Sequence, residues 1–306
     1  MTLISIILSL LLEQVRPMAV GRVDAWLNGW AQFLENRLNA GERSHGVAAW
    51  TLGVAVPALL VLALYLFLLA NNMVAAVLFN IALLYLTTGF RQFSHYFTDI
   101  QMALRMGELD RARQLLGEWR GASAEHLNSG EIARLAIEES LLASHRHVFA
   151  PLFWFVILGP AGAVLYRLAR HLYRSWGRSA RGELGDFGEC AERAFAIIDW
   201  LPVRLTAAAF AVVGDFEDAV YCWRSQASRW PEEAPGILLA TGAGALGVRL
   251  GMPIHAAGGI GERPELGTGD DADPDFMQST IGLVWRTLVM ALLLLTLLGI
   301  AVWVGR

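Results

Sequence analysis

The feature that most constrains the fold is a long stretch without an ionisable side chain. Residues 46–90, 45 in all, contain no Asp, Glu, Lys, Arg or His. A helix needs roughly 20 apolar residues to cross a bilayer, so this stretch is long enough for two crossings. Asn71 and Asn72 interrupt it near its middle. We therefore predict a transmembrane hairpin of residues 47–70 and 73–90, with Pro57 tolerated inside the first helix.

The composition supports a membrane protein. Hydrophobic residues make up 55% of the chain, charged residues only 17%, and the mean hydropathy is +0.45. A soluble domain usually has about 25% charged residues. We expect an all-α fold, a polytopic helical membrane protein with amphipathic extramembrane helices. The expected location is the bacterial inner (plasma) membrane, with several crossings and the lipid bilayer as first partner.

Three further apolar segments are expected near or in the membrane. Residues 287–304 carry no charge and lie between Arg286 and Arg306, which is typical of a C-terminal transmembrane helix. Residues 148–165 are long enough to cross, but Pro151 and the Gly159–Pro160 step favour a broken or re-entrant helix. The first twelve residues predict a short anchor or an interfacial helix.

The remaining segments suggest helices exposed to water. Residues 99–119 show apolar positions every three or four residues, which predicts one amphipathic surface helix. A second helix is expected to begin at Ser129 and to run toward Glu138. Residues 258–275, rich in Gly, Pro and Asp, are expected to be irregular and exposed. We divide the chain into residues 1–90 (anchor and hairpin), 91–147 (extramembrane helices), 148–280 (broken helices and loops) and 281–306 (C-terminal helix).

The basic residues exclude several functions. All 24 are arginine, whereas a Walker P-loop and Schiff-base chemistry both need lysine. The net charge of −4 argues against a nucleic-acid partner. Cys190 and Cys222 lie far apart and outside any metal-binding spacing, and the pair His145 and His147 lacks a neighbouring ligand, so no metal site is expected.

Two other patterns are assigned to helix packing. Residues 242–247 fit GxGxxG, but no strand pattern precedes them, so close helix packing is favoured over a dinucleotide site. Asp199 and Arg204 lie in the otherwise apolar residues 197–213, where charges are costly unless paired. We predict a structural ion pair between them and keep a ligand contact as the alternative.

Six segments, in order along nearly the whole chain, carry a resemblance to a known family. They are WAQFLENRLNAGERSHGV at 30–47, RMGELDRARQLL at 105–116, APLFWFVILGPAGAVLYRL at 150–168, DWLPVRLTA at 199–207, GALGVRLGMP at 244–253 and ERPELGTG at 262–269. These segments resemble the CobD/CbiB family of membrane proteins, with which AmpE is grouped as a related branch. The resemblance implies a role in cobalamin biosynthesis.

Family members similar to CbiB join an aminopropanol unit, or its phosphate, to a corrinoid propionate as an amide at the expense of ATP. The resemblance therefore implies a corrinoid substrate, with ATP and Mg as cofactors if the synthase activity is retained. Glu138 is the expected catalytic acid. Arg249, Arg263 and Glu262 lie in the two C-terminal motifs and are the expected substrate-binding residues, because guanidinium groups suit phosphate and carboxylate.

Some positions depart from the family pattern. Residues 140–149, SLLASHRHVF, keep neither the Asn nor the Asp that follow the conserved Glu in the pattern. An alternative function thus stays open, an AmpE-like, non-catalytic membrane sensor or regulator linked to β-lactamase induction and acting through membrane-protein partners.

Overall fold

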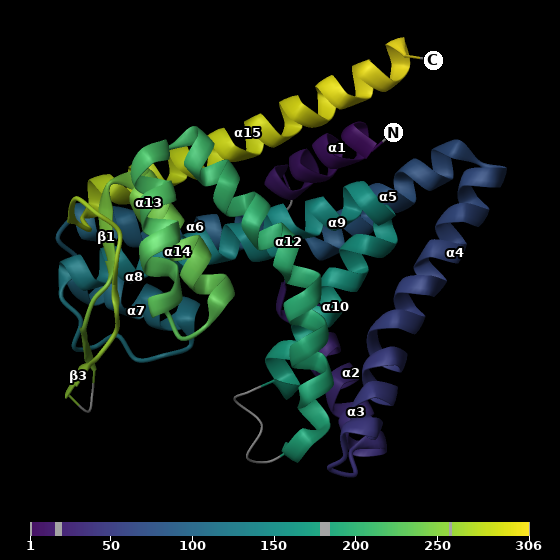
Figure 1. Cartoon of the computed structure of the whole chain (residues 1–306), viewed down its shortest axis with the longest axis horizontal. Coiled ribbons are helices and arrows are strands. Elements are labelled where there is room, and N and C mark those ends of the chain that lie inside the picture. The colour runs from purple at the N-terminus through teal and green to yellow at the C-terminus, as the bar shows by residue number, and fades with distance from the viewer. Residues whose placement is uncertain (1, 16–19, 178–183, 257–258, 306) are drawn as a thin grey trace. The chain divides into compact units, whose positions relative to one another are not determined.

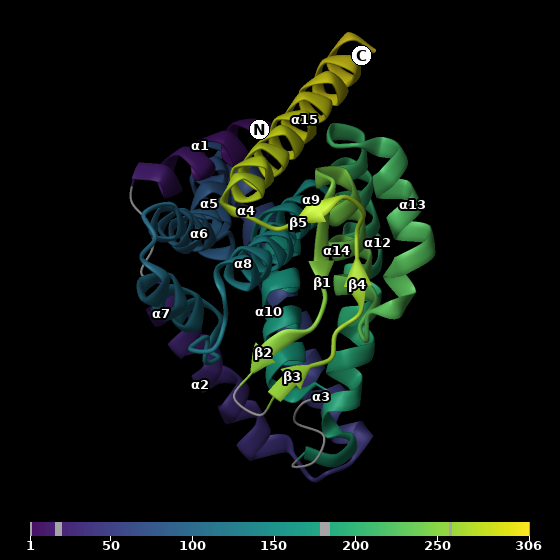
Figure 2. The ribbon, with the colours of Figure 1, turned by 90° about the vertical axis from the view of Figure 1, so that its left-hand side faces the viewer.

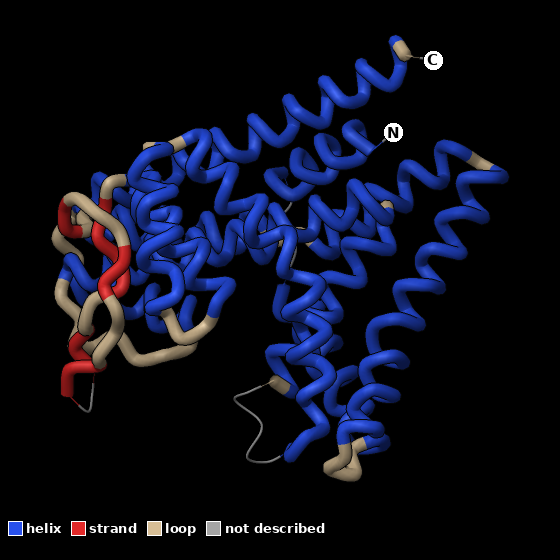
Figure 3. Tube along the Cα trace, viewed as in Figure 1, coloured by secondary structure: helices blue, strands red, loops and turns tan. Residues whose placement is uncertain are grey.

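The structure is a computed structural model that describes residues 2–15, 20–177, 184–256 and 259–305, and these residues are mostly helical (Figures 1 and 3). The chain divides into two compact units. The first contains Met1–Phe90 and His147–Pro202, and the second contains Arg91–Arg146 and Val203–Arg306. Each unit is therefore built from two separate stretches of the sequence.

Among its described residues, the first unit contains helices joined by short turns and no strand. Its elements are α1 (Thr2–Val15), α2 (Val20–Leu38), α3 (Arg43–Trp50), the π-helical turn η1 (Thr51–Ala55), α4 (Val56–Asn71), α5 (Met73–Thr87), α9 (Ala150–Leu158), α10 (Pro160–Trp176), the 3-10 turn η4 (Gly185–Gly188) and the first half of α12 (Glu189–Val213). Helix α12 contains Pro202, where the two units divide.

The predicted hairpin is confirmed as helix–turn–helix (Figure 1). Asn72 ends α4 and caps α5, since its side-chain oxygen accepts hydrogen bonds from Val74 N at 3.0 Å and Ala75 N at 3.1 Å. Such a cap satisfies the first free N–H groups of a helix. Pro57 lies in the first turn of α4, where its missing N–H costs no hydrogen bond.

The predicted break in residues 148–165 is also confirmed. Gly159, with φ 62° and ψ −150°, separates α9 from α10 and adopts a conformation that favours glycine. A Cβ on Gly162 would lie 2.0 Å from Trp154 O, so the two helices approach closely only because this residue has no side chain.

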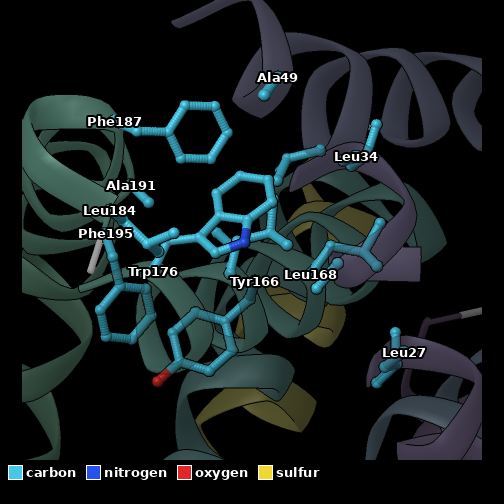
Figure 4. Packing of buried hydrophobic residues seen from close by; sticks show 14 of the residues in the cluster. Leu27, Leu34, Ala49, Tyr166, Leu168, Trp176, Leu184, Phe187, Ala191 and Phe195 are labelled. Atoms are coloured by element: carbon cyan, nitrogen blue, oxygen red, sulfur yellow. The ribbon is translucent and has the colours of Figure 1, made fainter. Parts of the chain in front are cut away.

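The hydrophobic core of the first unit contains four buried aromatic rings among leucine and alanine side chains (Figure 4). Trp176 and Phe187 lie with ring centroids 5.0 Å apart at 62°, and Tyr166 and Phe195 lie 5.7 Å apart. Helix α3 joins this core through Gly46, where a Cβ would be 2.1 Å from Phe187 O. Large rings therefore fix α10, η4 and α12 together.

The second unit combines helices with short strands. Its helices are α6 (Phe90–Arg105), α7 (Leu109–Arg120), α8 (Ser129–Ser144), α13 (Phe216–Gln226), the 3-10 turn η5 (Ala227–Arg229), α14 (Glu233–Leu246) and α15 (Pro274–Val304), and the π-helical turn η2 (His145–Phe149) follows α8. The single surface helix predicted for residues 99–119 is wrong, because α6 ends at Arg105 and α7 begins at Leu109. Gly107, with φ 76°, makes the turn between them.

Short strands follow α14 (Figure 2). They are β1 (Val248–Gly251), β2 (Ile254–Ala256), β3 (Gly259–Gly261), β4 (Glu265–Leu266) and β5 (Asp270–Asp271). Strand β1 pairs antiparallel with β4 and parallel with β5, and β2 pairs antiparallel with β3. The irregular loop predicted for residues 258–275 thus contains three strands, with Gly267 and Gly269 at positive φ between them.

Among the described residues, four helices are long and apolar enough to cross a membrane: Arg43–Asn71, Ser129–Leu158, Asp186–Val213 and Pro274–Val302. The C-terminal helix is therefore confirmed as a candidate span. Two apolar helices are shorter, Thr2–Val15 and Met73–Thr87. The second arm of the hairpin is thus a helix of 15 residues, shorter than a usual crossing.

Candidate functional site

A row of charged side chains on α8 forms the candidate site. Glu131, Arg134 and Glu138 are three and four residues apart, so they share one face of the helix. Only 5%, 8% and 5% of their surfaces are exposed. Buried charges are costly unless they are paired and hydrogen-bonded, so the segment that covers this face must supply partners.

The local sequence explains where α8 begins. The Asn128 side chain accepts a hydrogen bond from Glu131 N at 2.9 Å, and Glu131 Oε2 accepts one from Asn128 N at 2.8 Å. This reciprocal pair is a capping box, which fixes the first turn of a helix. It also holds the Glu131 carboxylate at the start of the charged face.

The chain after α14 covers this face, and β1 packs against both α8 and α14 (Figure 2). Glu138 accepts a hydrogen bond from Gly251 N at 2.9 Å with Oε1 and one from the Arg263 guanidinium with Oε2. Arg134 donates to Pro253 O at 2.9 Å and contacts Met252 Sδ at 3.4 Å. The turn after β1 is thereby fastened to α8 by both charges.

Met252 occupies this turn with φ 61°, a left-handed conformation that side chains other than Gly rarely adopt. Residues on both sides of it are hydrogen-bonded to α8, Gly251 to Glu138 and Pro253 to Arg134. These contacts hold the strained backbone in place. Strain that the surroundings enforce is a feature of functional sites.

Two arginines at this site keep unused donors. Arg134 Nε and Arg263 Nη1 are buried and have no hydrogen-bond partner among the described residues. The Arg263 guanidinium also lies over the Trp230 ring, 5.0 Å from its centroid. Planar guanidinium groups with free N–H donors suit the oxygens of a phosphate or carboxylate.

Arg249 lies on β1 among carboxylates. Its Nη2 is 2.9 Å from Asp271 Oδ1, on the neighbouring strand β5, and its Nη1 is 3.7 Å from Glu265 Oε1, on β4. Its Nε has no partner among the described residues. Glu262, the remaining residue expected to bind substrate, is exposed between β3 and β4.

The structure thus brings Glu138 and Arg263 into contact, whereas Asp199 and Arg204 each have another partner. Asp199 accepts a hydrogen bond from Tyr166 Oη at 3.0 Å in the first unit. Arg204 donates to Glu233 Oε1 at 2.6 Å in the second unit. The ion pair between Asp199 and Arg204 stays a prediction.

Three residues of the site, Glu131, Arg134 and His255, were not expected from the sequence. The spacing of Glu131, Arg134 and Glu138 along the sequence could have indicated that Glu131 and Arg134 belong to the site. Charged side chains at helical spacing are unusual in an apolar segment. No sequence pattern pointed to His255, because it is an isolated histidine just before the expected loop. Its Nδ1 lies 2.8 Å from Glu131 Oε1.

The glycine motif serves packing at two of its positions. A Cβ on Gly244 would lie 2.4 Å from Asp218 O on α13, and one on Gly242 would lie 2.6 Å from the Leu141 side chain on α8. Gly247 does not lie on a helix face as the packing interpretation expected. It follows the last residue of α14 and adopts the left-handed conformation that ends the helix. The motif forms the C-terminal end of α14, and strand β1 follows it, the reverse of the strand-to-helix turn of a dinucleotide-binding site.

The donor set fits a phosphate better than a resident metal ion. The described residues contain no group of three His, Cys, Asp or Glu side chains that could hold a metal. Glu131 and Glu138 are both engaged by N–H donors of the protein. A nucleotide-bound Mg²⁺ keeps most of its waters and needs few protein ligands, so the arginines are the residues here that fit ATP.

The family model for the CobD/Cbib protein matches residues 3–284. A cobalamin biosynthesis protein CobD from Stutzerimonas stutzeri is 37% identical over 270 residues, which cover 87% of both chains. Another from Chromobacterium violaceum is 37% identical over 71% of this chain and 70% of its own length. No solved structure matches the chain. Because the model and both relatives cover most of the sequence, the chain belongs to the CobD/CbiB family of cobalamin biosynthesis proteins.

Proposed function

We propose that this protein is the amide-forming synthase that joins an aminopropanol unit, or its phosphate, to a corrinoid propionate with consumption of ATP in the bacterial inner membrane. The two relatives that are 37% identical are both named for cobalamin biosynthesis, which supports the corrinoid substrate. The observation that carries the reaction type is a pair of arginines, Arg134 and Arg263, each with a buried N–H donor that has no partner among the described residues.

A carboxylate forms an amide only after activation. Transfer of a phosphoryl group from ATP to a propionate oxygen gives an acyl phosphate and ADP. The amine then attacks the carbonyl carbon, the new C–N bond forms, and the C–O bond to phosphate breaks with its electron pair leaving on phosphate. Negative charge gathers on phosphoryl and carbonyl oxygens in both steps, and fixed N–H donors in a dry site stabilise it.

Arg134 and Arg263 are the residues that we assign to these oxygens. Glu138 uses one oxygen for Gly251 N and the other for Arg263. In this proposal Glu138 therefore orients the Arg263 guanidinium and is a positioning residue, whereas the expectation from sequence made it the catalytic acid. Arg249 and Glu262, nearer the surface, would contact the outer part of a bulky substrate.

The test is complementation together with product formation. The chain is expressed in a strain that lacks the synthase, and growth is scored on cobyric acid. The purified protein is then given cobyric acid, aminopropanol and ATP, and the amide and ADP are quantified. We expect complementation by the wild type and loss of product in Arg134→Gln and Arg263→Gln.

Arg105→Gln is the matched control, because Arg105 is half-exposed and pairs with the exposed Asp275 at 3.0 Å. It should retain activity. A wild-type chain that reaches a normal level in the membrane, yet neither complements nor forms the amide, would contradict the proposal. That result would favour the AmpE-like regulatory alternative.

A further inference from the structure

A histidine and a buried carboxylate form a pair at the beginning of the charged face of α8. His255 Nδ1 lies 2.8 Å from Glu131 Oε1, and His255 N donates to the same oxygen at 2.9 Å. The Glu131 side chain is only 6% exposed, whereas the His255 side chain is 60% exposed. One edge of the imidazole is thus held by the protein and the other faces outward.

The chemistry of the pair fixes the roles of the two ring nitrogens. An ionised carboxylate can only accept hydrogen bonds, so Nδ1 carries the proton that Glu131 accepts. Nε2 of the neutral ring is then a proton acceptor. A carboxylate that orients a histidine in this way is the arrangement found where a histidine acts as a general base.

A purely structural role explains only part of these contacts. Glu131 already caps α8 with Oε2, and Oε1 already receives the backbone N–H of His255. Both contacts would persist with any residue except proline at position 255, because neither uses the His255 side chain. The additional bond to Nδ1 does not fasten the backbone further; it orients an exposed imidazole ring.

The position of the pair fits the second half of the proposed reaction. Arg134 lies three residues beyond Glu131, about 4.5 Å along the helix axis at 1.5 Å per residue. The carboxylate–histidine pair and the arginine with an unused donor are therefore neighbours on one face. Of the charged groups of α8, Glu131 contacts His255 and Arg134 contacts Pro253, two residues earlier, and the paired strand β3 carries no titratable side chain.

We propose that His255, oriented by Glu131, is the general base that takes the proton from the attacking amine; this rests on the proposed function. The amine binds neutral, after its ammonium form has released one proton to water. As its nitrogen bonds to the acyl carbon, His255 Nε2 takes the second proton and phosphate leaves with the C–O electron pair. The imidazolium then returns its proton to water.

Two substitutions separate the base from the structural contact. His255→Asn keeps an N–H donor near the place of Nδ1, so it can retain the bond to Glu131, but it has no proton acceptor at the place of Nε2. His255→Gln removes the base as well. Removal of a general base typically costs about 10²- to 10⁴-fold in rate, so we expect at least about a 100-fold loss of amide formation in both variants.

Hydroxylamine serves as a second nucleophile. It is largely unprotonated and strongly nucleophilic at neutral pH, so it needs little help from a base. We expect the wild type and both variants to form the corrinoid hydroxamate from cobyric acid and ATP at rates within about threefold. His95→Gln, which changes an exposed histidine of the same unit, is the control and should keep both rates.

The outcomes separate the two proposals. Wild type that forms neither amide nor hydroxamate overturns the synthase function and this inference with it. Wild type that forms the amide, with His255→Asn retaining half or more of that rate, overturns the general base alone. Equal loss of amide and hydroxamate in folded His255→Asn also overturns it, because the defect would then precede attack by the amine. Melting temperature and membrane level establish that each variant is folded.

Discussion

A close contact between α13 and α14 gives a quantitative prediction for Gly244→Ala. A Cβ at this position would lie 2.4 Å from Asp218 O, 2.6 Å from Asp218 C and 2.8 Å from Ala219 Cα. All three are backbone atoms of α13, so no side-chain rotation can relieve the clash and the helices must move apart. Overpacking of this kind costs typically about 1–3 kcal/mol.

Helix propensity works in the opposite direction. Replacing Gly by Ala inside a helix stabilises it by about 0.5–1 kcal/mol. We therefore expect a net destabilisation of about 1–2 kcal/mol, the upper part of the overpacking range less the propensity gain. At about 2–4 °C per kcal/mol, the melting temperature in detergent should fall by about 2–8 °C. Gly244→Leu should lower it further.

Gly282→Ala is the matched control, because it lies within α15 with no atom within 4 Å of the added Cβ. It should leave the melting temperature unchanged or raise it slightly. The packing explanation is refuted if Gly244→Ala behaves like this control. Saturable NAD binding by the wild type that Gly244→Leu abolishes would also refute it, since such binding would restore the dinucleotide interpretation of the motif.

Further predictions concern topology, pH and the ion pair. Ser44 and Asn72 lie at opposite ends of the candidate span Arg43–Asn71. Cysteines placed at these two positions should react with membrane-impermeant reagents from opposite sides of the membrane. If both react from the same side, this helix does not cross. Burial lowers the pKa of His171, so stability should fall as pH drops through the unfolded value, about 6.5, and His171→Gln should flatten that dependence in thermal melts. Glu138→Gln should lower the melting temperature, because the Arg263 charge, in a side chain only 17% exposed, loses its carboxylate partner; for a fully buried pair such a loss costs roughly 3–5 kcal/mol, an upper bound here. The double substitution with Arg263→Gln should recover part of that loss without restoring complementation, and full complementation by either single variant at normal abundance contradicts the site.

The apolar elements were predictable because their signals are local. The uncharged run, the Asn72 turn and the Gly159–Pro160 break each depend on neighbouring residues. The structure confirms the helical hairpin, its turn and the break, although only the first arm is long enough to be a candidate span. The division of residues 99–119 was missed because the apolar period continues across Gly107. Only the left-handed turn at this glycine, φ 76°, separates the two helices.

The site itself was only partly predictable. Family resemblance pointed to Glu138 and Arg263, but their contact joins residues 125 positions apart, which periodicity cannot show. The strands that bring them together are two to four residues long, too short for a recognisable alternation. His255 was missed for the same reason, since its partner Glu131 lies 124 positions earlier.

Burial distinguishes α8 from the other apolar helices and explains why it can carry charge. Twelve of the 16 residues of α8 are buried inside the protein. By contrast, only 17% of the apolar window of Arg43–Asn71 and 22% of that of Pro274–Val302 are buried. The latter two present most of their surface outward, as a helix in lipid would. The charged face of α8 is covered by β1 and the turn that follows it, so its charges meet N–H and C=O groups instead of lipid. Ionisable side chains in an apolar helix destabilise it unless they are paired, and they are usually found where they serve a function. We therefore assign the proposed chemistry to that face, and the helices that face outward are candidate membrane spans.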